Sequence, residues 1–341
     1  MTRRLTLAFV ASVLLTVCAT VPRGQTQTQP AQTPVPPIKL ARQPDYHAGR
    51  LAFTYLGDIW TAAENGGDPD RITDHIGHDM SPKFSPDGKW IAFASNRYGS
   101  NDVFVVPSGG GTATRLTFHP GGDDVVGWTR DSTKVLIRSA RNAGAFPNVA
   151  TLWEVPVAGG PEVALPLDWG AYGSYSPDGR SLAFNRHPSS WTRQHYRSFA
   201  AADLWIANLA AKTFTQLLPN ERYNRLWPMW GTDNMIYFVA DPLPNDSKVI
   251  PGSPDIRKSA NNIYKISPTG GQPVQVTHHP DGNLFWPSMS SDGKVIVYES
   301  MFGLWKLDVA SGRTSEIRIS IASDDKANES DLEVVRIHLP T

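Results

Sequence analysis

The sequence of 341 residues contains little cysteine and no excess of charge of either sign. Its single cysteine, Cys18, excludes a disulfide framework and a cysteine-rich zinc site. Lys and Arg number 32 and Asp and Glu also number 32, so the formal net charge is zero. A general nucleic-acid binder would need a positive excess to release counterions from phosphates. We therefore expect no nucleic-acid partner.

The sequence also lacks the short motifs of common catalytic and cofactor sites. It has no G-x-S-x-G elbow, no H-E-x-x-H pair, no Walker loop and no EF-hand spacing. Serine, histidine and aspartate residues are scattered, and nothing in their spacing favours one triad over another. The sequence therefore predicts no catalytic residue, no metal site and no cofactor.

Residues 1–21 have the pattern of a secretory signal peptide. Two arginines precede an apolar run from Leu5 to about Val21, with small residues near Cys18. The run is slightly short for a membrane span, and no stop-transfer charge cluster follows it, although an uncleaved anchor is an open alternative. Bulky Val17 disfavours lipid attachment at Cys18. We predict a periplasmic or secreted protein with no stable membrane insertion after cleavage.

The rest of the chain contains a repeat, which is centred on a short strand with an aromatic residue at its end. Successive aromatic residues are 44, 49, 52, 59 and 41 positions apart, which is the size of a four-stranded propeller blade. The six aromatic residues are Trp60, Phe104, Trp153, Trp205, Tyr264 and Trp305.

Tight turns precede the aromatic strands. Ser-Pro-Asp-Gly at residues 85–88 and 176–179, and Ser-Ser-Asp-Gly at 290–293, lead into apolar strands. Proline presets the first turn angle, aspartate bonds nearby amides and glycine takes the positive φ. A glycine turn and a polar-alternating edge strand follow the aromatic strand. No amphipathic helical stretch of useful length interrupts the units.

These observations predict an all-β fold, a six-bladed β-propeller of four-stranded antiparallel blades. A flexible linker rich in Pro, Gln and Thr precedes it at residues 22–39, and a charged tail follows at 323–341. The tail alternates in polarity over 333–339, as expected of an entry into a further domain or of a strand that docks on the first blade. The expected blades are 40–79, 80–122, 123–170, 171–223, 224–281 and 282–322.

The repeat resembles the propeller repeats of TolB and of tricorn-type proteases, over residues 40 to about 322. Three phrases, at residues 51–60, 84–93 and 286–293, are similar to the N-terminal propeller of bacterial tricorn-like serine proteases. Full-length members add a second propeller, a PDZ domain and a catalytic domain with a serine nucleophile. The resemblance therefore implies proteolysis only if a further C-terminal part exists. None of the family's catalytic residues has a position in this sequence.

Long insertions are concentrated on one of the two expected faces of the ring. In an up-and-down blade, the first-to-second and third-to-fourth strand turns share one face, here called the turn face. The second-to-third loops and the links between blades share the other, here called the linker face. Aromatic and cationic side chains in these insertions suit recognition of carboxylates or peptides, and packing of the loops over their own blades is the open alternative. The predicted ligand-binding residues are Trp191, Arg193, His195, Tyr196, Arg197, Arg257 and Lys258.

Histidines recur after a threonine in the links between units. A repeated position favours hydrogen bonding between blades, whereas a ring of metal or ligand contacts has no carboxylate spacing to support it. Three repeated aspartates are expected to be structural, and three tryptophans on or near the innermost strands are expected in the core or the channel wall. These sets are His75, His119 and His278 or His279; Asp58, Asp102 and Asp203; and Trp227, Trp230 and Trp286.

Two functions from different classes fit the sequence better than an enzyme. The leading interpretation is an exported, noncatalytic propeller that binds or channels peptide or protein ligands, as the first module of a tricorn-like protease. The alternative is a stand-alone TolB-like periplasmic scaffold that binds another envelope protein. An enzyme with a site in the central channel is a third possibility, although no motif supports it. The sequence predicts no oligomeric state.

Overall fold

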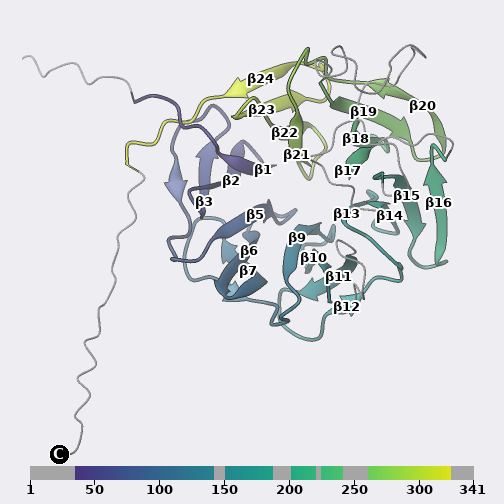
Figure 1. Cartoon of the computed structure of the whole chain (residues 1–341), viewed down its shortest axis with the longest axis horizontal. Coiled ribbons are helices and arrows are strands. Elements are labelled where there is room, and N and C mark those ends of the chain that lie inside the picture. Colours follow the sequence, from purple (N-terminus) through teal and green to yellow (C-terminus); the bar gives the residue numbers. More distant parts are fainter. Residues whose placement is uncertain (1–34, 142–149, 187–200, 220–223, 241–259, 324–341) are drawn as a thin grey trace, which may run out of the picture. The chain divides into compact units, whose positions relative to one another are not determined.

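The chain folds into six four-stranded antiparallel sheets, each built from four consecutive strands. The computed structural model describes residues 35–141, 150–186, 201–219, 224–240 and 260–323, all of which belong to one compact unit. The sheets surround a central axis, with the first strand of each innermost (Figure 1). The predicted all-β fold, a six-bladed β-propeller, is confirmed. Among these residues no helix is long and apolar enough to cross a bilayer.

The four strands of each blade follow one another outward from the axis. The innermost strands are β1 (Arg42–His47), β5 (Asp79–Phe84), β9 (Asp123–Trp128), β13 (Tyr172–Tyr175), β17 (Arg225–Trp230) and β21 (Leu284–Met289). The second strands are β2 (Arg50–Tyr55), β6 (Trp90–Tyr98), β10 (Lys134–Ser139), β14 (Ser181–Asn185), β18 (Ile236–Ala240) and β22 (Val295–Ser300).

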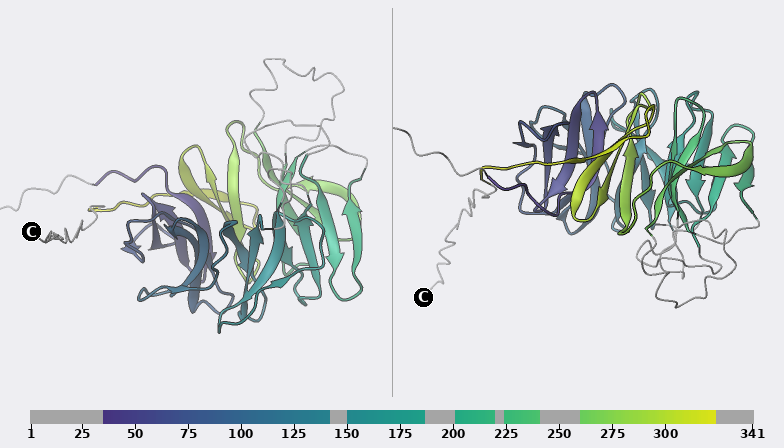
Figure 2. Two further views of the ribbon diagram at one scale, coloured as in Figure 1. Left: turned by 60° about the horizontal axis from the view of Figure 1, so that its bottom comes forward. Right: turned by 90° about the horizontal axis from the view of Figure 1, so that it is seen from above.

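The third strands are β3 (Asp58–Ala63), β7 (Ser100–Pro107), β11 (Thr151–Pro156), β15 (Leu204–Asn208), β19 (Asn262–Ser267) and β23 (Gly303–Asp308). The outermost strands are β4 (Asp70–Arg71), β8 (Thr114–Arg115), β12 (Val163–Ala164), β16 (Thr213–Leu217), β20 (Gly270–Gln275) and β24 (Thr314–Ile317). Blades 1 to 6 are numbered in this order. Seen from the side, their strands run between two opposite faces (Figure 2).

The turn sequences form β-hairpins by the same local hydrogen bonds in three blades. Ser85 Oγ donates to Asp87 Oδ1 at 2.6 Å and accepts the Trp90 amide at 3.0 Å, while Gly88 has a φ of 72°. The turns that begin at Ser176 and Ser290 repeat the serine-to-aspartate bond at 2.6 and 2.7 Å. These turns join the first and second strands and therefore define the turn face.

Middle strands are apolar on both sides because each sheet is covered by a blade on either side. On β2, Leu51, Ala52 and Phe53 are all fully buried. Phe53 packs in the cluster shared with blade 6, whereas Ala52 packs in the cluster shared with blade 2. Burial of each large side chain of this kind contributes about 1.5–3 kcal/mol, so the contacts between blades form the core of the molecule.

The repeated aspartates make their contacts within their own blades. Asp102 is fully buried, and its Oδ2 accepts a bond from Arg115 on the edge strand at 2.7 Å. Asp203 Oδ2 accepts the indole N–H of Trp205 at 2.7 Å. Asp58 lies 4.0 Å from Arg71, also on the edge strand of its blade. These contacts support the structural role expected for the set.

Blade 6 and blade 1 meet without exchanging a strand, so side chains must join them. Glu299 on β22 accepts Arg42 Nε at 2.7 Å and the Gln43 amide at 2.6 Å. Burial raises the pKa of Glu299, and these two bonds from blade 1 oppose that rise. Outside the sheets, the Ile38 amide donates to the Ile319 carbonyl at 2.8 Å. An apolar cluster, which includes Tyr46 and Ile317, fills the same seam.

Innermost strands of four blades share a left-handed residue directly before a proline. The proline removes a ladder donor, and each of these strands has a β-bulge at this point. A bulky residue with positive φ is an outlier that costs of order 1–3 kcal/mol, and such strain tends to mark functional positions. The four residues, here called the collar, are Gln43 (φ 52°), Ser81 (φ 56°), Trp227 (φ 56°) and Trp286 (φ 49°).

The bulges turn collar amides toward neighbouring blades. The Ser81 amide donates to Gln43 Oε1 at 2.9 Å, and the Trp227 amide donates to Asn185 Oδ1 at 3.0 Å. The Gln43 amide makes the corresponding bond to Glu299. The strained positions therefore connect blades around the axis in addition to placing side chains on it.

We predict that Glu299→Ala lowers the free energy of unfolding by about 2–4 kcal/mol, because it leaves the Gln43 amide and Arg42 without their buried acceptor. Chemical denaturation measures the change. Glu316→Ala is the matched control, since Glu316 also pairs with an arginine, Arg318, but on an exposed strand. Equal stability of the two variants would show that this seam does not depend on Glu299.

Candidate functional site

All six innermost strands line a cavity of about 170 Å³ on the propeller axis. Each innermost strand begins at the linker face and ends at the turn face. The wall of the cavity is therefore described at three levels, according to the position of each residue along these strands. The collar and Tyr172 lie at the level nearest the linker face, and Asp45, Lys83 and Ser288 lie at the middle level. Residues of the turns, among them Arg130, form the last level. The predicted placement of Trp227, Trp230 and Trp286 in the core or channel wall is confirmed.

Three aromatic rings gather at the linker-face end of this cavity. The rings of Trp227 and Trp286 are 5.4 Å apart between centroids and inclined by 50°. Tyr172 lies 5.8 Å from Trp227 and 6.3 Å from Trp286. Such inclined arrangements are favourable for aromatic pairs. Trp227 is buried, whereas Tyr172 and Trp286 are partly exposed, so the group presents aromatic surface at the end of the axis.

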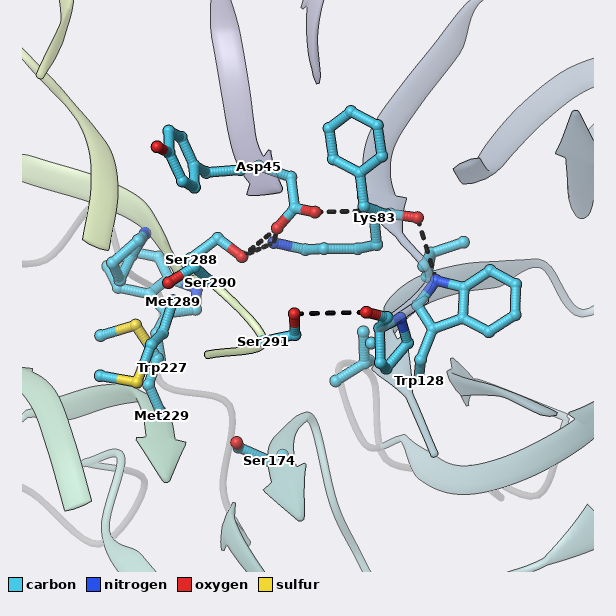
Figure 3. Close-up of a pocket in the computed structure, with 18 of the residues that line it drawn as sticks. Asp45, Lys83, Trp128, Ser174, Trp227, Met229, Ser288, Met289, Ser290 and Ser291 are labelled. Carbon is cyan, nitrogen blue, oxygen red and sulfur yellow. Dashed lines mark hydrogen bonds and ion pairs between the residues drawn. The ribbon is translucent and has the colours of Figure 1, made fainter. Parts of the chain in front are cut away.

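At the middle level, three blades contribute one polar cluster. Lys83 Nζ donates to Ser288 Oγ at 2.7 Å and lies 3.5 Å from Asp45 Oδ1. Ser288 donates to the same carboxylate, whose other oxygen accepts the Phe84 amide at 2.7 Å. Figure 3 shows Asp45, Lys83 and Ser288 pointing toward one another, with Ser174 on the facing wall. The lysine is neutralised by the carboxylate, so the cluster works as a strut between blades 1, 2 and 6.

Arg130 forms a second strut near the turn face. Its guanidinium donates to the carbonyls of Tyr175 at 2.5 Å, Trp230 at 3.0 Å and Ser176 at 3.2 Å. Burial lowers the pKa of Arg130, because desolvation disfavours the charged form. The bond to Trp230 crosses from blade 3 to blade 5. Side chains thus bridge non-neighbouring blades at more than one level of the axis.

The predicted ligand-binding residues cannot be placed against this cavity. Trp191, Arg193, His195, Tyr196 and Arg197 fall within residues 187–200, and Arg257 and Lys258 fall within 241–259; both segments lie outside the described residues. They connect β14 to β15 and β18 to β19, second and third strands of blades 4 and 5. Their role in binding stays a prediction.

The repeated histidines make two kinds of contact. His279 Nε2 bonds the Tyr298 hydroxyl of the next blade at 2.8 Å, as expected for blade-to-blade bonding. Burial lowers the pKa of His279 and favours its neutral form. His75 and His119 each accept, through Nδ1, an amide two residues later in their own link at 2.9 Å, and their role between blades stays a prediction. The described part of the chain holds no group of three or more potential metal ligands.

Comparison of the sequence with known protein families identifies the family of this propeller. Residues 38–313 match the family described as the tricorn protease N-terminal beta propeller domain. The chain belongs to this family. That match runs from just before β1 to just before β24, the outer strand of blade 6, so the resemblance inferred from the turn and strand repeats is confirmed.

Two relatives of this tricorn-type propeller are more than three times as long as this chain. Tricorn protease homolog 1 of Streptomyces coelicolor is 29% identical over 293 residues, which are 83% of this chain and 25% of that protein. The crystal structure of the tricorn protease matches 85% of this chain and 27% of that chain, with a TM-score of 0.70 and 19% identity. The chain therefore spans about a quarter of the length of these two tricorn relatives.

A TolB-type structure from Agrobacterium tumefaciens shares the fold as well. It matches 75% of this chain and 87% of that chain, with a TM-score of 0.56 and 19% identity. At this identity the similarity establishes the architecture only. The same propeller fold thus also occurs in a chain of similar length to this one.

We predict that Lys83→Met destabilises the propeller by about 3 kcal/mol, because it leaves the buried carboxylate of Asp45 without its cation. Denaturant unfolding measures the loss. Lys89→Met serves as the control, since Lys89 pairs with Asp87 in the same blade but is largely exposed. If Lys83→Met were as stable as the control, the middle-level cluster would not be a strut.

Proposed function

We propose that this tricorn-type propeller is an exported, noncatalytic module that binds peptide or protein ligands at the linker-face end of its axis. The observation that carries the proposal is the group of Trp227, Trp286 and Tyr172 at that end of the cavity. Aromatic surface held in place by the backbone binds apolar or aromatic side chains at little entropic cost. Two of the three rings are held by strained collar positions.

Binding fits the axis better than passage of a peptide through it. A cavity of about 170 Å³ is well below the 300–1,000 Å³ of typical ligand pockets, and it suits a single side chain. The bonds from Lys83 to Ser288 and from Arg130 to Trp230 both span non-neighbouring blades. A threaded chain would have to break them. The proposal therefore keeps the binding interpretation and sets channelling aside.

Export rests on residues 1–21, which have the pattern of a signal peptide. Proteolysis belongs to this proposal only through a catalytic part elsewhere, because Tricorn protease homolog 1 of Streptomyces coelicolor is more than three times as long as this chain.

Isothermal titration with a blocked peptide that contains phenylalanine, and with the same peptide carrying alanine, tests the site. We expect the phenylalanine peptide to bind and Trp286→Ala to weaken its affinity at least about tenfold. Trp153→Ala is the control, because Trp153 lies on β11, away from the axis, against Arg141. Equal weak binding of both peptides would reject the aromatic site. If the double variant Arg193→Ala/Arg197→Ala binds the phenylalanine peptide as tightly as the native chain, only the predicted role of this loop in binding is rejected.

A TolB-like scaffold that binds another envelope protein is the second candidate, favoured by the match to 87% of a TolB-type chain. Intact mass of the native protein from its own cells separates it from the protease module. We expect the scaffold to run slightly below 37.4 kDa after signal cleavage. A species far above that mass would support the protease module and rule out the scaffold.

A further inference from the structure

One cavity joins the aromatic rings at the linker-face end of the axis to polar side chains at the middle level. Lys83, Ser174 and Ser288 all line it, each from a different blade. On β13, whose register with β14 is regular, Tyr172 and Ser174 are two positions apart and both line the cavity. Two positions along a strand span about 6–7 Å, so one long side chain that enters between the rings reaches the polar level.

Lys83 keeps a hydrogen-bond donor for a ligand at this level. An ammonium group has three N–H bonds. One is donated to Ser288 Oγ at 2.7 Å, and a second faces Asp45 Oδ1 at 3.5 Å. Among the described residues no acceptor takes the third. Because the Lys83 side chain is 19% exposed inside the ring, this donor is accessible from the cavity.

Ser174 provides a second donor on the facing wall (Figure 3). Its Oγ accepts the Trp230 amide at 2.9 Å, but its hydroxyl proton has no acceptor within the part of the chain that the structure describes. The residue is only partly buried. A hydroxyl group can donate one bond and accept two, so Ser174 uses part of its capacity. Lys83 and Ser174 therefore present two unused donors from opposite walls of one cavity.

A neutral oxygen suits these donors better than a carboxylate does. Asp45 already neutralises Lys83, and a second anion would have to share that cation with it. The rings of Tyr172, Trp227 and Trp286 in turn favour a flat aromatic body above the donors. A phenol group meets both requirements, because it carries a hydroxyl oxygen at the far end of an aromatic ring. Its own proton can bond a remaining lone pair of Ser174.

We propose that the peptide residue bound at the linker-face end of the axis is tyrosine, whose hydroxyl oxygen accepts bonds from Lys83 and Ser174. This assignment rests on the proposed function of the propeller and adds the residue type to it. Phenylalanine fills the same cavity but leaves both donors covered and without an acceptor. A site that bonds a ligand hydroxyl discriminates against the analogue that lacks it, because its own polar groups are then left unpaired.

Isothermal titration with four blocked peptides, identical except for tyrosine, phenylalanine, glutamate or alanine at one position, tests the assignment. We expect the tyrosine peptide to bind at least about tenfold more tightly than the phenylalanine peptide, and the other two to bind more weakly than both. Ser174→Ala should reduce this preference at least about threefold and leave the affinity for the phenylalanine peptide unchanged. Ser291→Ala is the matched control, since Ser291 lines the same cavity but already donates to the Pro86 carbonyl at 3.4 Å.

The comparison of tyrosine with phenylalanine needs no variant, and circular dichroism shows whether each serine variant keeps the native fold. Equal affinities for these two peptides, both above that for alanine, would overturn the tyrosine assignment and leave the aromatic site intact. A folded Ser174→Ala variant with the full preference for tyrosine would overturn the assignment as well, and so would tightest binding of the glutamate peptide. Equally weak binding of all four peptides would reject the aromatic site and the assignment together.

Discussion

The bond between Glu299 of blade 6 and the start of β1 is the interaction on which the ring depends most. Every other pair of neighbouring blades is joined by the chain itself, whereas blades 6 and 1 share no strand. Glu299 accepts the Gln43 amide and Arg42 Nε there, in a buried setting that opposes its own ionisation. Since the axial cavity exists only in a closed ring, the position of Asp45, Lys83 and Ser288 follows from this seam.

A second constraint gives the axis its chemistry. Proline after the collar residues interrupts the ladder of the innermost strands, and the bulges turn collar side chains onto the axis. A strand without this interruption would need no left-handed residue. The strained backbone at Trp227 and Trp286 therefore places their two indole rings side by side at the linker-face end of the cavity. This aromatic group lies toward the linker face, while the opposite face is formed by the hairpin turns.

The sequence was sufficient for the blades because their signals are local. Ser85 to Gly88 form the expected hairpin turn, and Asp102 and Asp203, each two residues before an aromatic, bond within their own blades. The collar also has a local signal that the sequence reading missed, namely a proline on the innermost strand in four units. The cluster of Ser288 with Asp45 has no such signal, because 243 positions separate the two residues. The local bonds of His75 and His119 had no signal in the repeat, because a ring nitrogen can accept a nearby amide as well as a distant one.

The central claim is that the linker face and its end of the axis carry the interactions of this propeller. Hydrogen–deuterium exchange of the chain with and without the phenylalanine peptide tests it most directly, because amide protection reports each face separately. We predict slower exchange at residues 225–230 and 284–289, with no change in the turns at 85–89 and 129–133. Protection confined to those turns would contradict the account.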